Sequence, residues 1–189
     1  MKTAALLRPK TRRRWTYREM VAESPETNLP VELWNGEIIM SPAPDPDHQE
    51  IVFNFARCLR DFTSRESLGR TFISPLDVVL SERRVVQPDV LFIARANLGM
   101  VKNHIDGVPD LVMEVISDGS WQRDRIDKKA LYEQSGLKEY WIVDPASRTI
   151  EVFALKKSGY QLYAKGTDSE PVQSKLLSGF KVSFDQLKG

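Results

Sequence analysis

Two short apolar segments of this chain each carry an acid at a position that a buried strand normally gives to an apolar side chain. They are residues 87–93 (QPDVLFI), which contain Asp89, and residues 109–117 (PDLVMEVIS), which contain Glu114. A carboxylate inside a buried strand is costly unless it is paired or bound to a cation. On adjacent strands, two such carboxylates can share one divalent ion, and Mg²⁺ prefers this ligand set with added water and phosphate oxygens. The structural alternative is that each acid caps a strand end or meets a buried arginine.

The spacing of the glycines excludes several familiar ligand-binding loops. The ten glycines are never closer than seven positions apart. Dinucleotide-binding loops, nucleophile elbows and phosphate-binding loops all need closer glycines. The single cysteine, Cys58, excludes an internal disulfide and indicates a reducing compartment, and with only two histidines it leaves no Cys/His zinc site. Carboxylates and lysines remain, and they suit a hard metal ion better than covalent catalysis.

The balanced net charge of +1 hides a basic segment at the N-terminus. We interpret residues 1–15 as a basic tail that precedes a single domain at residues 16–189. A solvated tail, a transit peptide and a nucleic-acid-binding arm all fit this composition. No apolar run approaches the roughly 18 residues of a membrane span, so we expect a cytoplasmic protein with no membrane partner. The basic residues before position 19 are Lys2, Arg8, Lys10, Arg12, Arg13, Arg14 and Arg18.

Hydrophobic spacing predicts an α/β (α+β) fold with a mixed central β-sheet flanked by helices. A hairpin is expected over residues 33–40, because Asn35-Gly36 is a strong two-residue turn signal. In the strand at residues 139–143, Tyr140 and Trp141 are expected on opposite faces. The other expected elements are helices at 16–22, 48–62 and 124–135, with Thr16 and Asp47 near the first two starts and Gly136 after the last, and strands at 72–80, 86–93, 111–116, 149–153 and 159–164.

Two lysines follow the second acid, on the helix expected at residues 124–135. Lys128 and Lys129 are each candidates to stabilise charge at a metal site or to assist proton transfer. The alternative for each is a solvated surface lysine. Helical periodicity does not decide between them, because they lie on neighbouring parts of the same helix.

These residues together resemble a known class of nucleases. A "PD" pair, a second acid in an apolar strand and a lysine resemble the PD-(D/E)XK nuclease superfamily. More narrowly, nearly the whole chain resembles the Uma-two family of restriction-endonuclease-like proteins. The resemblance is carried by NGEIIMSPAPDPDHQ (35–49), QPDVLFI (87–93), PDLVMEVIS (109–117), D-x-x-x-K (124–128), LYEQSGLKEYWIVDP (131–145) and LSGFKVSF (177–184).

The resemblance implies a restriction endonuclease-like core and a set of site residues. Asp89 and Glu114 match the metal-binding acids. The usual Glu-x-Lys is broken, because position 116 is Ile, and D-x-x-x-K aligns the lysine role with Lys128 rather than Lys129. Glu37 and His48 match acidic and histidine positions near the site. The alternative for Glu37 is a hairpin residue, and the alternative for His48 is a helix-start or surface residue. Asp118 and Asp124 are interpreted as a loop acid and a helix N-terminal acid.

The implied activity is a Mg²⁺-dependent endonuclease that hydrolyses DNA phosphodiester bonds with metal-activated water, with Mn²⁺ as a substitute. Cutting two strands with a small domain favours a homodimer. A non-catalytic relative that keeps the fold and binds nucleic acid or protein is the main alternative, and the neutral net charge favours it. Action on a small phosphoester is a third possibility.

Overall fold

The structure is a computed structural model that describes residues 13–23, 29–117 and 123–188. Most of the expected basic tail and Asp118 therefore lie outside the described residues. No helix in these described ranges is both long and apolar enough to cross a membrane.

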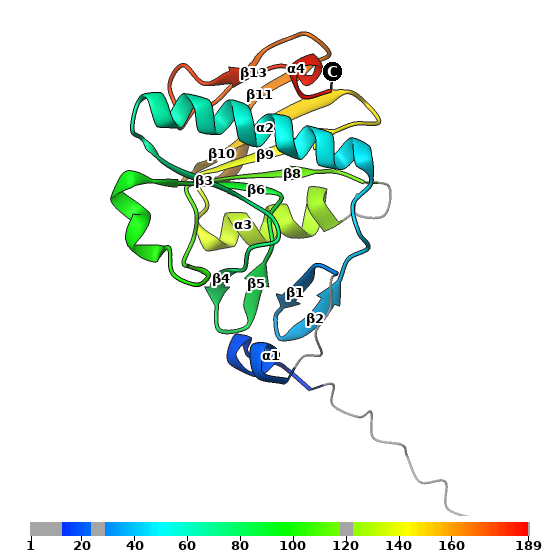
Figure 1. Cartoon of the computed structure of the whole chain (residues 1–189), viewed down its shortest axis with the longest axis vertical. Coiled ribbons are helices and arrows are strands. Elements are labelled where there is room, and N and C mark those ends of the chain that lie inside the picture. The colour runs from blue at the N-terminus through cyan, green and yellow to red at the C-terminus, as the bar shows by residue number, and fades with distance from the viewer. Residues whose placement is uncertain (1–12, 24–28, 118–122, 189) are drawn as a thin grey trace, which may run out of the picture.

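A six-stranded mixed sheet runs through the middle of the described chain (Figure 1). It consists of β3 (Gly69–Ile73), β6 (Val90–Ala94), β8 (Leu111–Val115), β9 (Glu139–Asp144), β10 (Thr149–Lys156) and β11 (Gly159–Thr167). The strand order is β11-β10-β9-β8-β6-β3. All neighbours are antiparallel except β8 and β9, which are parallel and are joined by a helical crossover. The predicted mixed central sheet is thus confirmed.

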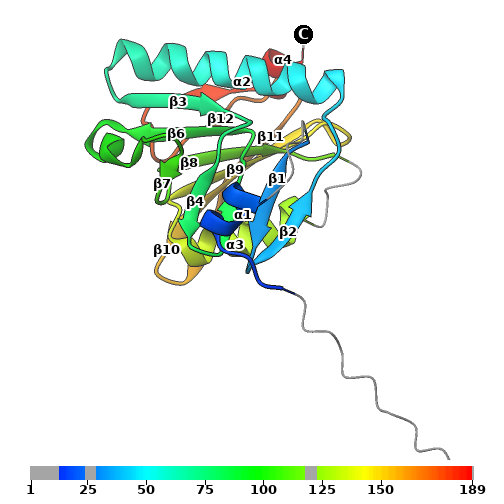
Figure 2. The same ribbon diagram turned by 60° about the horizontal axis from the view of Figure 1, so that its bottom comes forward.

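A second, five-stranded sheet lies on one side of the first (Figure 2). Its order is β2-β1-β5-β4-β7, with β4 and β7 parallel and the other pairs antiparallel. A two-stranded ribbon, β12 with β13, completes the described pairings. The strands are β1 (Val31–Trp34), β2 (Glu37–Met40), β4 (Val78–Ser81), β5 (Arg84–Val86), β7 (Ile105–Asp106), β12 (Val172–Gln173) and β13 (Lys181–Val182).

Helices cover both faces of the six-stranded sheet (Figure 1). The long helix α2 (Pro46–Arg65) lies with α4 (Phe184–Leu187) on one face, and α3 (Lys129–Ser135) lies on the other. A π-helix, η2 (Arg123–Lys128), runs directly into α3. The remaining helices are α1 (Tyr17–Glu23), beside the β1–β2 hairpin, and the 3₁₀ helix η1 (Arg95–Met100).

The apolar core has one layer on each face of this sheet. Trp141 packs with α2 residues such as Phe55 in one layer, whereas the adjacent Tyr140 packs with Tyr132 of α3 in the other. Both side chains of the strand are fully buried. The predicted opposite-face arrangement of Tyr140 and Trp141 is therefore confirmed, and it follows from the two-residue side-chain period of a strand.

The hairpin and the three predicted helices form, with small shifts at their ends. Asn35 and Gly36 both have positive φ, as a tight two-residue hairpin turn requires. Helix α2 begins earlier than the hydrophobic pattern suggested, because Asp45 accepts a hydrogen bond from the backbone N–H of His48 and Pro46 occupies the first turn. Gly136 ends α3 in the left-handed conformation.

Two predicted strands are wrong as single elements. Residues 72–80 are divided between β3 and β4, and residues 86–93 between β5 and β6. The chain enters the five-stranded sheet after Pro75 and leaves it before Pro88. A proline has no backbone N–H to donate to the hydrogen bonds between strands, so it favours such a break. The apolar pattern continues across the break because both parts are buried, each in a different sheet.

Candidate active site at the junction of the two sheets

The first predicted acid lies directly before β6. Asp89 Oδ2 accepts a hydrogen bond from the backbone N–H of Val115 at 2.8 Å, at the end of β8. The register pairs Val90 with Met113, so Asp89 lies one position beyond the ladder, opposite Glu114 if the register is continued. The two predicted acids therefore come from adjacent strands and from the same end of the β6–β8 pair.

The second acid forms a buried ion pair with the predicted lysine. Lys128 Nζ lies 2.9 Å from Glu114 Oε1, and both side chains are less than a tenth exposed. The hydroxyl of Tyr132 donates to the same oxygen at 2.8 Å. Burial, followed by the charge of Glu114, raises the pKa of Tyr132 well above its usual value, so this hydroxyl remains a donor. Glu114 is thus held from the α3 side of the sheet.

The π-helix explains why periodicity did not separate the two lysines. Lys128 is the last residue of the π-helical turn η2, and Lys129 is the first residue of α3. A π-turn inserts an extra residue, so the faces on either side of it do not follow one α-helical period. The structure directs Lys128 to Glu114, while the ammonium of Lys129 lies 3.6 Å from the centre of the Phe153 ring.

A third carboxylate, Glu32 of β1, joins this network. The sequence analysis did not predict Glu32 as a site residue. Glu32 Oε1 lies 3.5 Å from Lys128 Nζ and accepts a hydrogen bond from the backbone N–H of Gln87 at 2.9 Å. Its other oxygen accepts from the indole N–H of Trp34. Glu32 is only 3% exposed. The five-stranded sheet therefore contributes a residue to the site. The sequence signal that could have identified Glu32 is the same as for Glu114, an acid between two apolar residues, here Val31 and Leu33.

The two remaining candidates lie in different places. His48, in the first turn of α2, has Nε2 3.2 Å from Asp89 Oδ2, and both side chains are mostly buried. Glu37 lies on β2, where its half-exposed carboxylate is 3.4 Å from Arg14. Among the described contacts, Glu37 pairs with Arg14 and contacts none of the four other predicted site residues. Asp124 falls in η2, and its side chain is outside the described set.

The donor set fits a small hard cation of the magnesium type. Asp89, Glu114 and Glu32 supply three carboxylates, and the described ion pairs place Lys128 against Glu114 and Glu32, and His48 against Asp89. The described residues contain no group of three or more His, Cys, Asp or Glu side chains arranged to hold a metal. A cation here would therefore rest on the two facing acids Asp89 and Glu114. The remaining positions would go to water and substrate oxygens, which is how Mg²⁺ is usually bound.

This arrangement of sheets and crossover helix is that of a nuclease-like α+β fold. A solved structure from Anabaena variabilis ATCC 29413, described as "a putative nuclease belonging to DUF820", superposes with a TM-score of 0.76. The similarity covers 91% of this chain and 96% of that chain at 19% identity, so it shows a shared fold.

The sequence comparison is more specific. Residues 16–185 match the Uma2 family, described as "Putative restriction endonuclease", and the chain belongs to this family. No curated protein matches it. The family and the nuclease-like fold expected from the sequence motifs are both confirmed.

Proposed function

We propose that this protein is a Mg²⁺-dependent endonuclease that hydrolyses phosphodiester bonds in DNA. The observation that carries the proposal is the buried contact of Lys128 with Glu114, on the strand adjacent to Asp89. Two facing acids and one lysine are the groups that such a reaction needs, and the family description supports the substrate class.

In this mechanism Asp89 and Glu114 would hold the cation. Mg²⁺ bound there would supply Lewis-acid stabilisation of the phosphate and would acidify water. Hydrolysis adds a water oxygen to phosphorus, breaks one P–O ester bond and passes a water proton to the leaving oxygen, so negative charge grows on the phosphate oxygens in the transition state. The ammonium of Lys128 stabilises that charge, and Tyr132 fixes the carboxylate of Glu114. His48 orients the carboxylate of Asp89 through its 3.2 Å contact.

Nicking of supercoiled plasmid tests the proposal. The wild type is compared with Asp89→Asn, Glu114→Gln and Lys128→Ala, and Lys129→Ala is the matched control, because that lysine is the next residue but contacts Phe153. Wild type and Lys129→Ala should nick DNA when Mg²⁺ or Mn²⁺ is added. The two acid variants and Lys128→Ala should lose nicking.

Calorimetry with Mn²⁺ gives a second readout that does not depend on turnover. Asp89→Asn and Glu114→Gln should lose binding. Lys128→Ala should keep it, because the lysine acts on charge that grows during the reaction. Wild type that binds no metal, or acid variants that bind as well as wild type, would contradict the proposal.

One observation favours the non-catalytic alternative. Glu114, Glu32 and Lys128 are all nearly inaccessible and satisfy one another, as a purely structural network does. If that alternative holds, wild type and Asp89→Asn should shift DNA equally in a gel assay, and neither should nick it with metal present.

A further inference from the structure

Helix α2 and strand β3 lie side by side (Figure 2), and residues of both line a groove of about 830 Å³. The strand side is lined by Thr71, Phe72, Ile73, Pro75 and Leu76. The helix side is a single stripe at three- and four-residue spacing, which is one face of an α-helix. Its members are Phe53, Ala56, Arg57, Arg60, Asp61 and Ser64.

The backbone of β3 is open on the groove side. Arg95 N–H donates to Leu68 C=O, and Ser74 N–H donates to Asp89 C=O, at the two ends of the antiparallel β3–β6 pair. Because hydrogen-bonded positions alternate along such a pair, Gly69, Thr71 and Ile73 direct their N–H and C=O groups away from β6. Among the described strands, β6 alone pairs with β3.

The two edges of the six-stranded sheet differ in how they are protected. The ladder of the opposite edge strand, β11, carries a register shift between Val152 and Phe153, and β12 packs against it. Strand β3 pairs with β6 without any shift. The apolar side chains beside it are open to solvent, with Phe53 66% and Ile73 50% exposed. Proteins normally block an edge of this kind with a bulge, a charge or a covering element.

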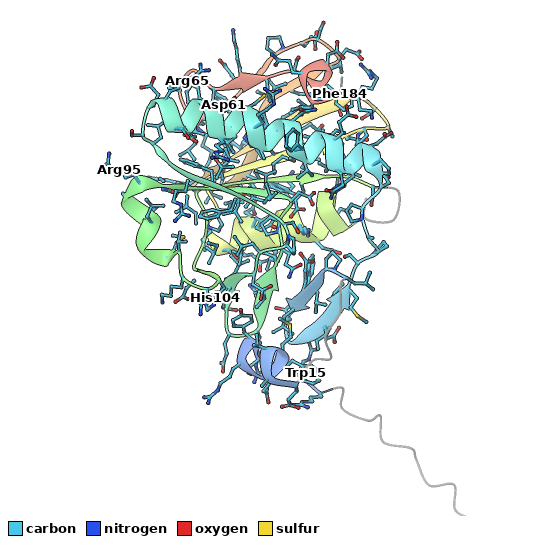
Figure 3. All side chains as sticks on the ribbon, viewed as in Figure 1. Trp15, Asp61, Arg65, Arg95, His104 and Phe184 are labelled. Carbon is cyan, nitrogen blue, oxygen red and sulfur yellow. The ribbon has the colours of Figure 1, made fainter. Side chains whose placement is uncertain are left out.

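We propose that this edge is the interface for a second copy of the same chain. A two-fold axis through Thr71 pairs β3 antiparallel with β3 of the second copy and sets Gly69 opposite Ile73. All three outward positions are then used, and the sheet continues across the dimer. The α2 stripes meet over the same axis. Each stripe carries Arg57, Arg60 and Asp61, of which Asp61 is labelled in Figure 3. Asp61 of one copy can therefore pair with Arg57 or Arg60 of the other.

This self-complementarity selects a second copy over other occupants. A nucleic acid would meet the carboxylate of Asp61 and the exposed ring of Phe53 on either side of the two arginines. A strand of an unrelated protein would pair with the open backbone of β3, but nothing in the structure gives it charges complementary to both Asp61 and the two arginines. A second copy satisfies the open backbone, the apolar side chains and the mixed charges together.

A charge exchange tests the interface. Sedimentation velocity over a range of concentrations should show a wild-type dimer. Asp61→Arg and the double variant Arg57→Glu/Arg60→Glu should each be monomeric, because their stripes carry one sign of charge. An equimolar mixture of the two variants should restore the dimer. The control Lys157→Glu, in the exposed turn between β10 and β11, should dimerise as wild type does.

A cross-link tests the register. Thr71→Cys should form an intermolecular disulfide when an oxidant is added, whereas wild type, which keeps Cys58, should not. Wild type that stays monomeric, or charge variants that dimerise alone, would overturn the proposal and leave the edge to a strand of another protein or to DNA. The assay contains no DNA or metal, so its outcome is independent of the proposed nuclease activity.

Discussion

At the scale of single residues, the most informative feature of this chain is an acid placed between apolar neighbours. That pattern predicted Asp89 and Glu114, and the structure places both at one end of adjacent strands. The same pattern occurs at Glu32, but β1 has only four residues, and the family resemblance selected Glu37 of the same hairpin instead. Helical periodicity could not choose Lys128 as the partner of Glu114, because Lys128 lies in the π-helical turn of η2, whereas the family resemblance selected it.

Replacing the buried lysine should cost much more stability than replacing its neighbour. Lys128→Ala leaves Glu114 and Glu32 buried without their cation and should destabilise the protein by about 3–5 kcal/mol. Lys129→Ala removes a cation–π interaction with Phe153, worth about 1 kcal/mol. Urea denaturation of the two variants measures the difference. Equal destabilisation would show that Lys128 is not held by the buried carboxylates.

Asp110 provides a pH-dependent prediction away from the candidate site. Burial raises the pKa of its carboxyl, but hydrogen bonds from Lys138, Asn97 and the backbone of Ala94 outweigh burial and lower the pKa below its usual value. A carboxylate with a lowered folded-state pKa stabilises the protein above the unfolded-state value, about 3.9, and this contribution is lost as the pH falls through the folded-state pKa.

Asp110→Asn should therefore destabilise the protein by about 2 kcal/mol at neutral pH. The difference from wild type should shrink as the pH falls below about 4, where the wild-type carboxyl also becomes protonated. Urea denaturation across this pH range measures both values. If the difference in unfolding free energy between wild type and Asp110→Asn does not change with pH, the ionised carboxylate of Asp110 does not stabilise the fold.

At the scale of elements, the sequence predicted which segments are helical or extended better than it predicted where strands change sheet. The C-terminal strands and Gly136 followed simple local rules, and these elements formed as expected. Residues 72–80 and 86–93 did not, because the apolar pattern reports burial and not the sheet in which a strand is buried. That assignment depends on long-range pairing, such as the pairing of Leu33 with Val85.

The packing of α2 on the sheet depends on Trp141. Its ring contacts Phe55 of α2 at a centroid distance of 5.4 Å and Phe180 at 5.8 Å, and its indole N–H donates to Glu139. Trp141→Ala should therefore cost roughly 3–5 kcal/mol of unfolding free energy. Leu162→Ala, at a half-exposed position of β11, is the control and should change stability by less than about 0.5 kcal/mol. Thermal denaturation and chemical denaturation should both show that Trp141→Ala is less stable than Leu162→Ala.

At the scale of the whole molecule, charge is distributed unevenly although its sum is near zero. Residues 1–12 carry Lys2, Arg8, Lys10 and Arg12, so removing them takes the formal net charge from +1 to −3. Arg13 and Arg14 contact Glu23 and Glu37, beside α1 and the hairpin. The backbone N–H of Trp15 then donates to Gly36 C=O, so the described fold is anchored from this point onward.

A deletion that ends at residue 12 should therefore separate DNA binding from folding. If the basic segment binds phosphates, its removal should flatten the dependence of log K on log salt by about 0.9 for each phosphate that is no longer neutralised. Thermal stability should be nearly unchanged, because the interactions of Arg13, Arg14 and Trp15 remain.

A full-length variant with Lys2, Arg8, Lys10 and Arg12 all changed to Ala separates the effect of charge from the effect of length, and it should reproduce the flatter slope. Fluorescence anisotropy with a short DNA duplex, measured over a salt series, gives the slopes. A slope that both variants share with wild type would mean that the basic segment does not bind the phosphate backbone.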